Sequence, residues 1–148
     1  MSDLYLYHAT DRKNLESILK NGLLIDPPEH AYEEFDCEDK IFLAFDPDVA
    51  ESYAEESDNS PDEIVLLKVK YSALHETSFE YDWNVRCEHA DEITTCVYTL
   101  DIPPSCIQEC KSSNEPSQKL DDFKGTYLYE ILLDTFYYEC ETCQDNYD

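Results

Sequence analysis

The stretch LYLYHATDRKNLESILKNGLL, residues 4–24, decides how the chain begins to fold. Its first part, Leu4–Tyr7, consists of aliphatic and aromatic residues, which predicts a β-strand. His8 follows at once, before the first residues that favour a helix. We therefore expect a strand followed by a helix, with a histidine at the junction between them.

The helix predicted after this strand carries a signal at each end. Thr10 or Asp11 is suited to cap its first turn, and Gly22 is suited to the left-handed position that ends a helix. Between them, apolar residues recur on one helical face: Leu15, Ile18 and Leu19. The spacing predicts a short amphipathic helix.

A second unit of the same kind follows an acidic, proline-containing loop. The run KIFLAF, residues 40–45, predicts a strand, after which Asp46 is a good cap and Pro47 suits the first helical position. Small and aromatic residues then recur at helical spacing: Val49, Ala50, Tyr53 and Ala54. This predicts a second strand joined directly to a helix.

The remainder of the chain favours strands. The segments EIVLLKVKYSAL (63–74) and EITTCVYTL (92–100) are rich in β-branched residues, and GTYLYEILLDTFYYE (125–139) is interpreted as a final strand or pair of strands. Two short early helices followed by strands indicate an α+β fold with antiparallel sheets. We expect one domain over residues 1–148, ending in an acidic segment.

The charge of the chain restricts its partners. Its 148 residues include 35 acidic and 10 basic ones, a formal net charge of -25. Such a field repels nucleic acid and anionic membranes and attracts basic protein surfaces, including those that normally hold nucleic acid. Adaptation to high salt is an alternative explanation, but seven cysteines and an excess of lysine over arginine are unexpected for it.

The amino end has neither a basic segment nor a long apolar run, so we expect a cytoplasmic protein with reduced cysteines. Two cysteine pairs, Cys106 with Cys110 and Cys140 with Cys143, have spacings that zinc sites use, but no glycine-bearing knuckle accompanies them. We therefore assign no metal-binding residue. Whether these four cysteines bind a metal stays an open question at this point. With only two glycines, the chain has no glycine-rich phosphate loop.

Taken in order, four segments carry a resemblance to a known superfamily. LYHAT, NLESILKNGLL, IFLAFDPDVAESYA and VYTLDIPPSCI together resemble the ADP-ribosyltransferase fold over roughly residues 4–110. That superfamily includes the poly-ADP-ribose polymerases, toxin-type transferases and tRNA 2′-phosphotransferases. The resemblance implies an α+β fold in which antiparallel sheets flank a cleft, with short helices.

The resemblance also implies NAD as a substrate and assigns residues to it. His8 would hydrogen-bond a ribose hydroxyl, while Ala9 and Thr10 beside it would hold the nicotinamide amide. Tyr53, on the helix after the second strand, would stack on the nicotinamide ring. Each residue also has an ordinary explanation, since a histidine near a strand end is often a surface residue and Tyr53 fits a core position.

The third motif of the family departs from its pattern in this chain. Its glutamate, which stabilises the oxocarbenium-like transition state, aligns with Thr94 or Thr95. Glu92 lies two residues before Thr94, on the same face of a regular strand, and a bulge would bring it into place. The implied catalytic set is therefore His8, Tyr53 and Glu92, although Glu92 is equally explained as one more acid.

Two functions remain open at this point. The first is an enzyme that transfers ADP-ribose from NAD to a macromolecular target, most plausibly a basic protein. The second is a non-catalytic acidic protein that mimics nucleic acid and occupies a basic groove on a nucleic-acid-binding protein, as phage-type inhibitors do. The tRNA 2′-phosphotransferase activity is rejected, because the chain has only Arg12 and Arg86 to hold phosphate and its charge repels tRNA.

Overall fold

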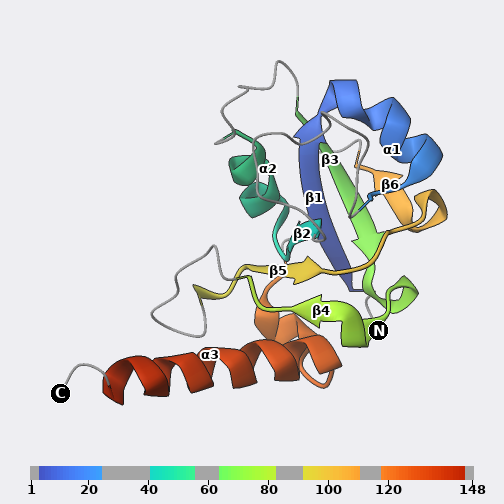
Figure 1. The fold of residues 1–148 in the computed structure, drawn as a ribbon. Coiled ribbons are helices and arrows are strands. Elements are labelled where there is room, and N and C mark those ends of the chain that lie inside the picture. Colours follow the sequence, from blue (N-terminus) through green and yellow to red (C-terminus); the bar gives the residue numbers. More distant parts are fainter. Residues whose placement is uncertain (1–3, 25–40, 56–63, 83–91, 111–117, 146–148) are drawn as a thin grey trace.

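The computed structural model describes residues 4–24, 41–55, 64–82, 92–110 and 118–145, with the side chains of 53–55 and 138–145 outside this description. Within these residues, six strands form one antiparallel sheet in the order β4-β5-β2-β1-β3-β6 (Figure 1). The strands are β1 (Tyr5–Asp11), β2 (Ile41–Ala44), β3 (Ile64–Lys70), β4 (Phe79–Glu80), β5 (Thr95–Tyr98) and β6 (Ile107–Glu109). The predicted α+β class with antiparallel pairing is confirmed.

The first strand is longer than its sequence pattern indicated. β1 pairs with β3 over its whole length, from Tyr5 opposite Lys70 to Asp11 opposite Ile64. The prediction that the strand ends at Tyr7 was therefore wrong, and His8 lies in the middle of β1. A long partner strand can supply ladder hydrogen bonds to polar residues that would not start a strand by themselves.

Caps explain where the two early helices begin and end. The Asp11 carboxylate accepts a hydrogen bond of 3.0 Å from the Lys13 N–H and starts the 3₁₀ turn η1 (Arg12–Asn14), which leads into α1 (Leu15–Asn21). At the far end, Gly22 has a φ of 86°, and its N–H donates to the Ile18 carbonyl. The predicted glycine stop is confirmed. Asp11 caps the 3₁₀ turn, whereas Asn14, the residue before α1, makes no side-chain cap hydrogen bond.

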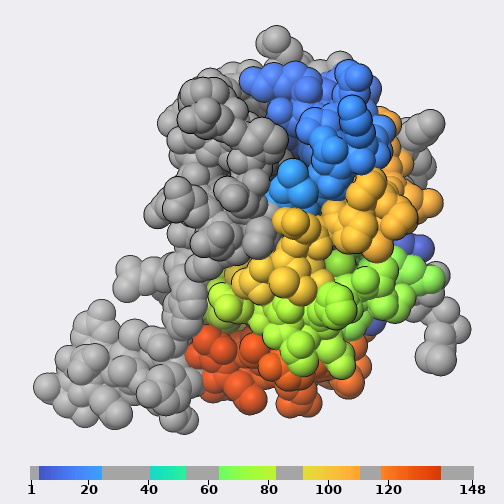
Figure 2. Space-filling view, turned by 45° about the vertical axis from the view of Figure 1, so that its right-hand side comes forward, coloured from blue at the N-terminus to red at the C-terminus, as the bar shows by residue number. Residues whose placement is uncertain are grey.

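After Gly22, the backbone is hydrogen-bonded to a segment about 80 residues further along the chain, at Ile102. Leu23 and Ile102 exchange two backbone hydrogen bonds of 2.9 and 2.8 Å, just before the 3₁₀ turn η5 (Pro104–Cys106). Figure 2 shows α1, the η5 segment, the β4 segment and α3 following one another down one face of the molecule.

The second helix also follows its predicted signals. α2 (Pro47–Glu55) begins where the Asp46 carboxylate accepts a hydrogen bond of 2.8 Å from the Asp48 N–H. Ala50 of α2 packs in a small cluster on one face of the sheet with Tyr7, Ala44 and Leu66. α2 therefore covers the middle of the sheet where β1, β2 and β3 meet.

The opposite face carries the larger core. It gathers buried residues from every strand and from α1 and α3, including Leu6, Leu43, Leu67, Val69, Phe79, Tyr98, Phe123 and Leu132. Phe123 ends the 3₁₀ turn η6 (Leu120–Phe123), which leads into α3. The two faces explain why the adjacent buried residues Leu6 and Tyr7 of β1 enter different clusters.

The last long segment is a helix, contrary to the predicted final strand or strands. α3 spans Tyr127–Asp145 and lies against β4 and the turn η3 (Glu76–Ser78) (Figure 1). Its buried residues recur every four positions, at Leu128, Leu132 and Phe136, which suits one face of a helix. In a strand, the exposed acids Glu130 and Asp134 would lie on that same face. The many tyrosines favoured the wrong interpretation, and the expectation of short helices alone was wrong too.

Candidate functional site

The sheet changes its pairing between its two central strands. β1 registers with β3 at seven residue pairs, but with β2 at one, Tyr7 opposite Ala44. β2 pairs instead with β5 along all four of its residues. Beyond Tyr7, residues 8–10 of β1 and residues 41–43 of β2 therefore share no ladder register among the described strands, and we call these two segments the β1–β2 fork.

His8 lies in this fork and bridges it with its side chain. Its Nδ1 lies 2.9 Å from the carbonyl oxygen of Phe42 in β2. In a neutral imidazole, the nitrogen facing a carbonyl must carry the proton, so Nδ1–H donates and Nε2 keeps a lone pair. The side chain thus satisfies a backbone carbonyl of the diverging strand and fixes the tautomer of the ring.

Burial favours the neutral form of this ring. Desolvation lowers the pKa of His8 below its ordinary value, and the hydrogen bond to the Phe42 carbonyl opposes this effect only in part. At neutral pH, the ring is therefore an uncharged group with one donor already used and one acceptor nitrogen. Such a group is suited to accept a hydrogen bond from a hydroxyl.

This lowered pKa predicts a pH dependence of stability. Below about pH 6.5 the unfolded chain protonates His8 more readily than the folded one, so stability falls as the pH falls through that value. We expect the wild type to lose more stability between about pH 7.5 and 5 than His8→Asn, whose amide can still donate to Phe42. Urea unfolding at several pH values measures the difference, and parallel curves for the two proteins would contradict it.

The neighbours of His8 on β1 are held by different parts of the fold. Thr10 is buried, and its hydroxyl accepts a hydrogen bond of 3.0 Å from the side-chain amide of Asn14 in η1. Ala9 is partly buried and packs against the cluster under α2. Thr10 therefore helps to hold the strand-to-helix connection, while Ala9 lies on the α2 side of β1.

The other two predicted site residues lie on separate elements. Tyr53 belongs to α2, but its side chain lies outside the described residues. Glu92 is exposed and precedes β5, which begins only at Thr95. The expectation that Glu92 continues the face of a regular strand was therefore wrong, because the strand starts after it.

A buried carboxylate that the sequence analysis missed lies close to the third motif. Asp82 follows β4 and is 4% exposed, and the Thr95 hydroxyl donates to it over 2.8 Å. Thr95 is one of the two residues aligned with the family's glutamate. Among 35 acids, the sequence does not mark Asp82, which lies between the predicted strands 63–74 and 92–100.

The register shows how this pair is placed relative to His8. Thr95 lies opposite Ala44, and Ala44 lies opposite Tyr7, so Thr95 shares the sheet face that α2 covers. His8 is the next residue after Tyr7 along β1, and successive strand residues project to opposite faces. Thr95 and its partner Asp82 are thus separated from His8 by the strand β2, and they lie on the opposite face of the sheet.

The buried Cys96 is not an activated thiol. Burial and, secondly, the charge of Asp82 raise the pKa of Cys96 far above its ordinary value, so this thiol stays protonated. Cys106 and Cys110 are partly buried, and the side chains of Cys140 and Cys143 lie outside the described residues. No cluster of three or more potential metal ligands occurs in the described part of the chain.

Neither a membrane-spanning helix among the described residues nor a matching family or curated protein gives a further indication of function. No helix within the described ranges has the length and apolar character needed to cross a membrane. Neither the models of known protein families nor the sequences of curated proteins match this chain. The geometry of the β1–β2 fork is therefore the main evidence about function.

Proposed function

We propose that the protein has an ADP-ribosyltransferase-like fold, binds NAD at the β1–β2 fork and transfers its ADP-ribose to a basic protein. The observation that carries the proposal is the state of His8. Its Nδ1 is held by the Phe42 carbonyl and its ring is kept neutral, so Nε2 can accept a hydrogen bond from a ribose hydroxyl.

The surroundings of His8 support the same assignment. Ala9 follows on β1, and its backbone is the group that would hold the nicotinamide amide. α2 packs against β1 and carries Tyr53, whose ring would stack on the nicotinamide. Because α2 covers the face of β1 opposite to His8, one NAD molecule would have to reach both groups through the β1–β2 fork.

In the proposed reaction, the bond between the nicotinamide nitrogen and the ribose C1′ breaks, and nicotinamide leaves with the bonding electrons as a neutral molecule. A nucleophile of the target attacks C1′ and gives up its proton. Glu92 would provide the negative charge that stabilises the cationic sugar in the transition state. His8 would orient the sugar, and Tyr53 would orient the leaving group.

The test compares two histidines of the same chain. His8→Ala should weaken NAD binding about fivefold or more, the cost of about one hydrogen bond of 1 kcal/mol. His75→Ala is the matched control, because His75 is exposed and lies in the turn before β4. Titration calorimetry measures affinity, and release of nicotinamide in the presence of a basic protein measures the reaction.

Glu92→Gln separates binding from chemistry. It should leave the affinity for NAD unchanged and lower nicotinamide release by roughly a hundredfold, the usual cost of a lost transition-state charge contact. Absence of NAD binding by the wild type would overturn the whole proposal. Unchanged release by Glu92→Gln would overturn only the role of Glu92.

A second candidate function is a non-catalytic acidic protein that occupies the nucleic-acid-binding groove of a basic protein. The observation that favours it is the replacement of the expected glutamate by Thr95, whose hydroxyl is engaged by Asp82, together with a net charge of -25. This function predicts a complex that weakens steeply with salt and needs no NAD. Wild type that binds a basic partner without binding NAD would select it.

A further inference from the structure

The outward face of α3 has an unusual make-up. Four residues at helical spacing, Tyr127, Glu130, Asp134 and Tyr137, lie within one narrow stripe of the helix, since each residue turns about 100°. All four are exposed, the two tyrosines by 40% and 54%. We call this set the α3 outer stripe.

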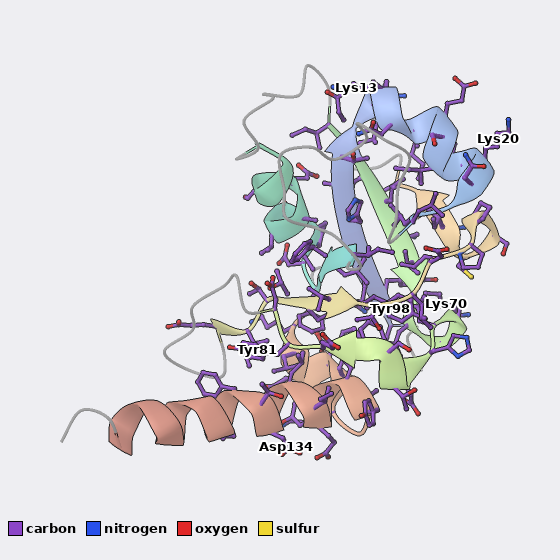
Figure 3. The ribbon with its side chains drawn as sticks, in the orientation of Figure 1. Lys13, Lys20, Lys70, Tyr81, Tyr98 and Asp134 are labelled. Atoms are coloured by element: carbon purple, nitrogen blue, oxygen red, sulfur yellow. The ribbon has the colours of Figure 1, made fainter. Side chains whose placement is uncertain are left out.

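The opposite face of the same helix holds it to the sheet. Leu128 and Leu132 are completely buried and Phe136 is nearly so. Figure 3 shows Asp134 on the side of α3 that points away from the sheet. The stripe therefore consists of groups that no strand of the described sheet covers, on a helix that packing holds in place.

Charge on α3 is entirely of one sign. Residues 127–145 contain five acids, Glu130, Asp134, Glu139, Glu141 and Asp145, and no lysine or arginine. Three of the five belong to the last turns of the helix, where the macrodipole is negative and acids are unfavourable. Cations near this end would stabilise the helix, and α3 itself supplies none.

Four lysines among the described residues can be placed relative to α3. Lys13 and Lys20 lie at the end of the molecule away from α3 (Figure 3). Within the described residues, Lys119 and Lys124 lie near the start of α3, not near its C-terminal turns. None of these four lysines therefore lies beside the C-terminal turns of α3.

We propose that the α3 outer stripe is a docking surface for a basic segment of another protein, rich in arginine and lysine. The carboxylates of Glu130 and Asp134 would pair with its cations, and arginine side chains would stack on the rings of Tyr127 and Tyr137. Cations beyond them would oppose the negative end of the helix dipole. This inference is independent of NAD, since α3 does not contribute to the β1–β2 fork.

The affinity test uses a fluorescently labelled oligo-arginine peptide as the probe. Asp134→Lys should weaken its binding about fivefold or more, measured by fluorescence anisotropy at moderate salt. Glu16→Lys is the matched control, because Glu16 is an exposed helical acid on α1 and the substitution changes the net charge equally. Equal losses in the two variants would overturn the proposal, since they would show attraction to the overall charge alone.

Two further measurements make the result specific to the stripe. Tyr137→Ser should weaken binding about threefold while Tyr137→Phe, which keeps the aromatic face, should not. Bound peptide should also slow amide hydrogen exchange in the last turns of α3, where its cations oppose the dipole. Unchanged exchange in α3, or no binding of the peptide by wild type, would overturn the proposal, whereas loss of NAD binding would leave it standing.

Discussion

Replacing Gly22 by alanine is expected to lower the free energy of unfolding by about 2–6 kcal/mol, among the largest effects of a single methyl group. Gly22 has a φ of 86°, in the region that favours glycine. An added Cβ would also run into the backbone carbonyl oxygen of Ile102 and lie 3.1 Å from the Pro104 ring. Because the obstacle is backbone, it cannot rotate aside.

The consequence reaches beyond α1. Relieving the clash requires Ile102 to move, and Ile102 is the residue that exchanges both backbone hydrogen bonds with Leu23. Urea unfolding followed by circular dichroism measures the loss, provided that the variant folds.

Gly125→Ala is the matched control for this prediction. Gly125 also has a positive φ, of 90°, but a Cβ there would meet no atom within 4 Å. It should cost only the backbone strain, about 1–2 kcal/mol. Equal losses at the two glycines would mean that conformation alone sets the cost, and would contradict the clash with Ile102.

Replacing Phe123 by alanine is expected to cost about 3–5 kcal/mol, as for other large aromatic residues removed from a core. Phe123 is completely buried at the end of η6. Its ring centroid lies 4.9 Å from that of Phe45, at the end of β2, and 5.6 Å from that of Tyr71, after β3. One side chain thus joins the segment before α3 to two separate parts of the sheet.

Thermal unfolding of two further variants tests whether the loss comes from the cavity. Phe123→Leu refills most of the space and should cost less than half as much as Phe123→Ala. Tyr137→Ala removes an exposed ring and should change stability by about 0.5 kcal/mol or less. If Tyr137→Ala matched Phe123→Ala, helix propensity in this region, and not packing, would be responsible.

The parts of the fold that were predicted correctly have local causes. Asp11, Gly22 and Asp46 act through backbone groups within a few residues of themselves, so their signals can be read from short windows. The α3 segment had an equally local signal in Leu128, Leu132 and Phe136. Its tyrosines and β-branched residues suggested a strand, and that propensity is weaker evidence than the four-residue period.

For the candidate site, the sequence predicted which residues belong to it but not which groups they contact. The order of motifs singled out His8, but its state depends on Phe42, which lies 34 residues away on a strand with which β1 has stopped pairing. Likewise Thr95 could be aligned with the family's glutamate, but the buried carboxylate that meets it, Asp82, is 13 residues away and follows another strand, β4. No local pattern contains such partners.

By itself, the sequence determined the acidic charge, the α+β class, the glycine end of α1 and the Asp46 cap of α2, because each depends on composition or on neighbours along the chain. Only the tertiary structure decided that β1 runs through His8, that β2 diverges from it, and that residues 127–145 form a helix over the sheet edge. Those outcomes depend on pairing and burial between distant segments, and contacts of that kind are settled only when the chain folds on itself.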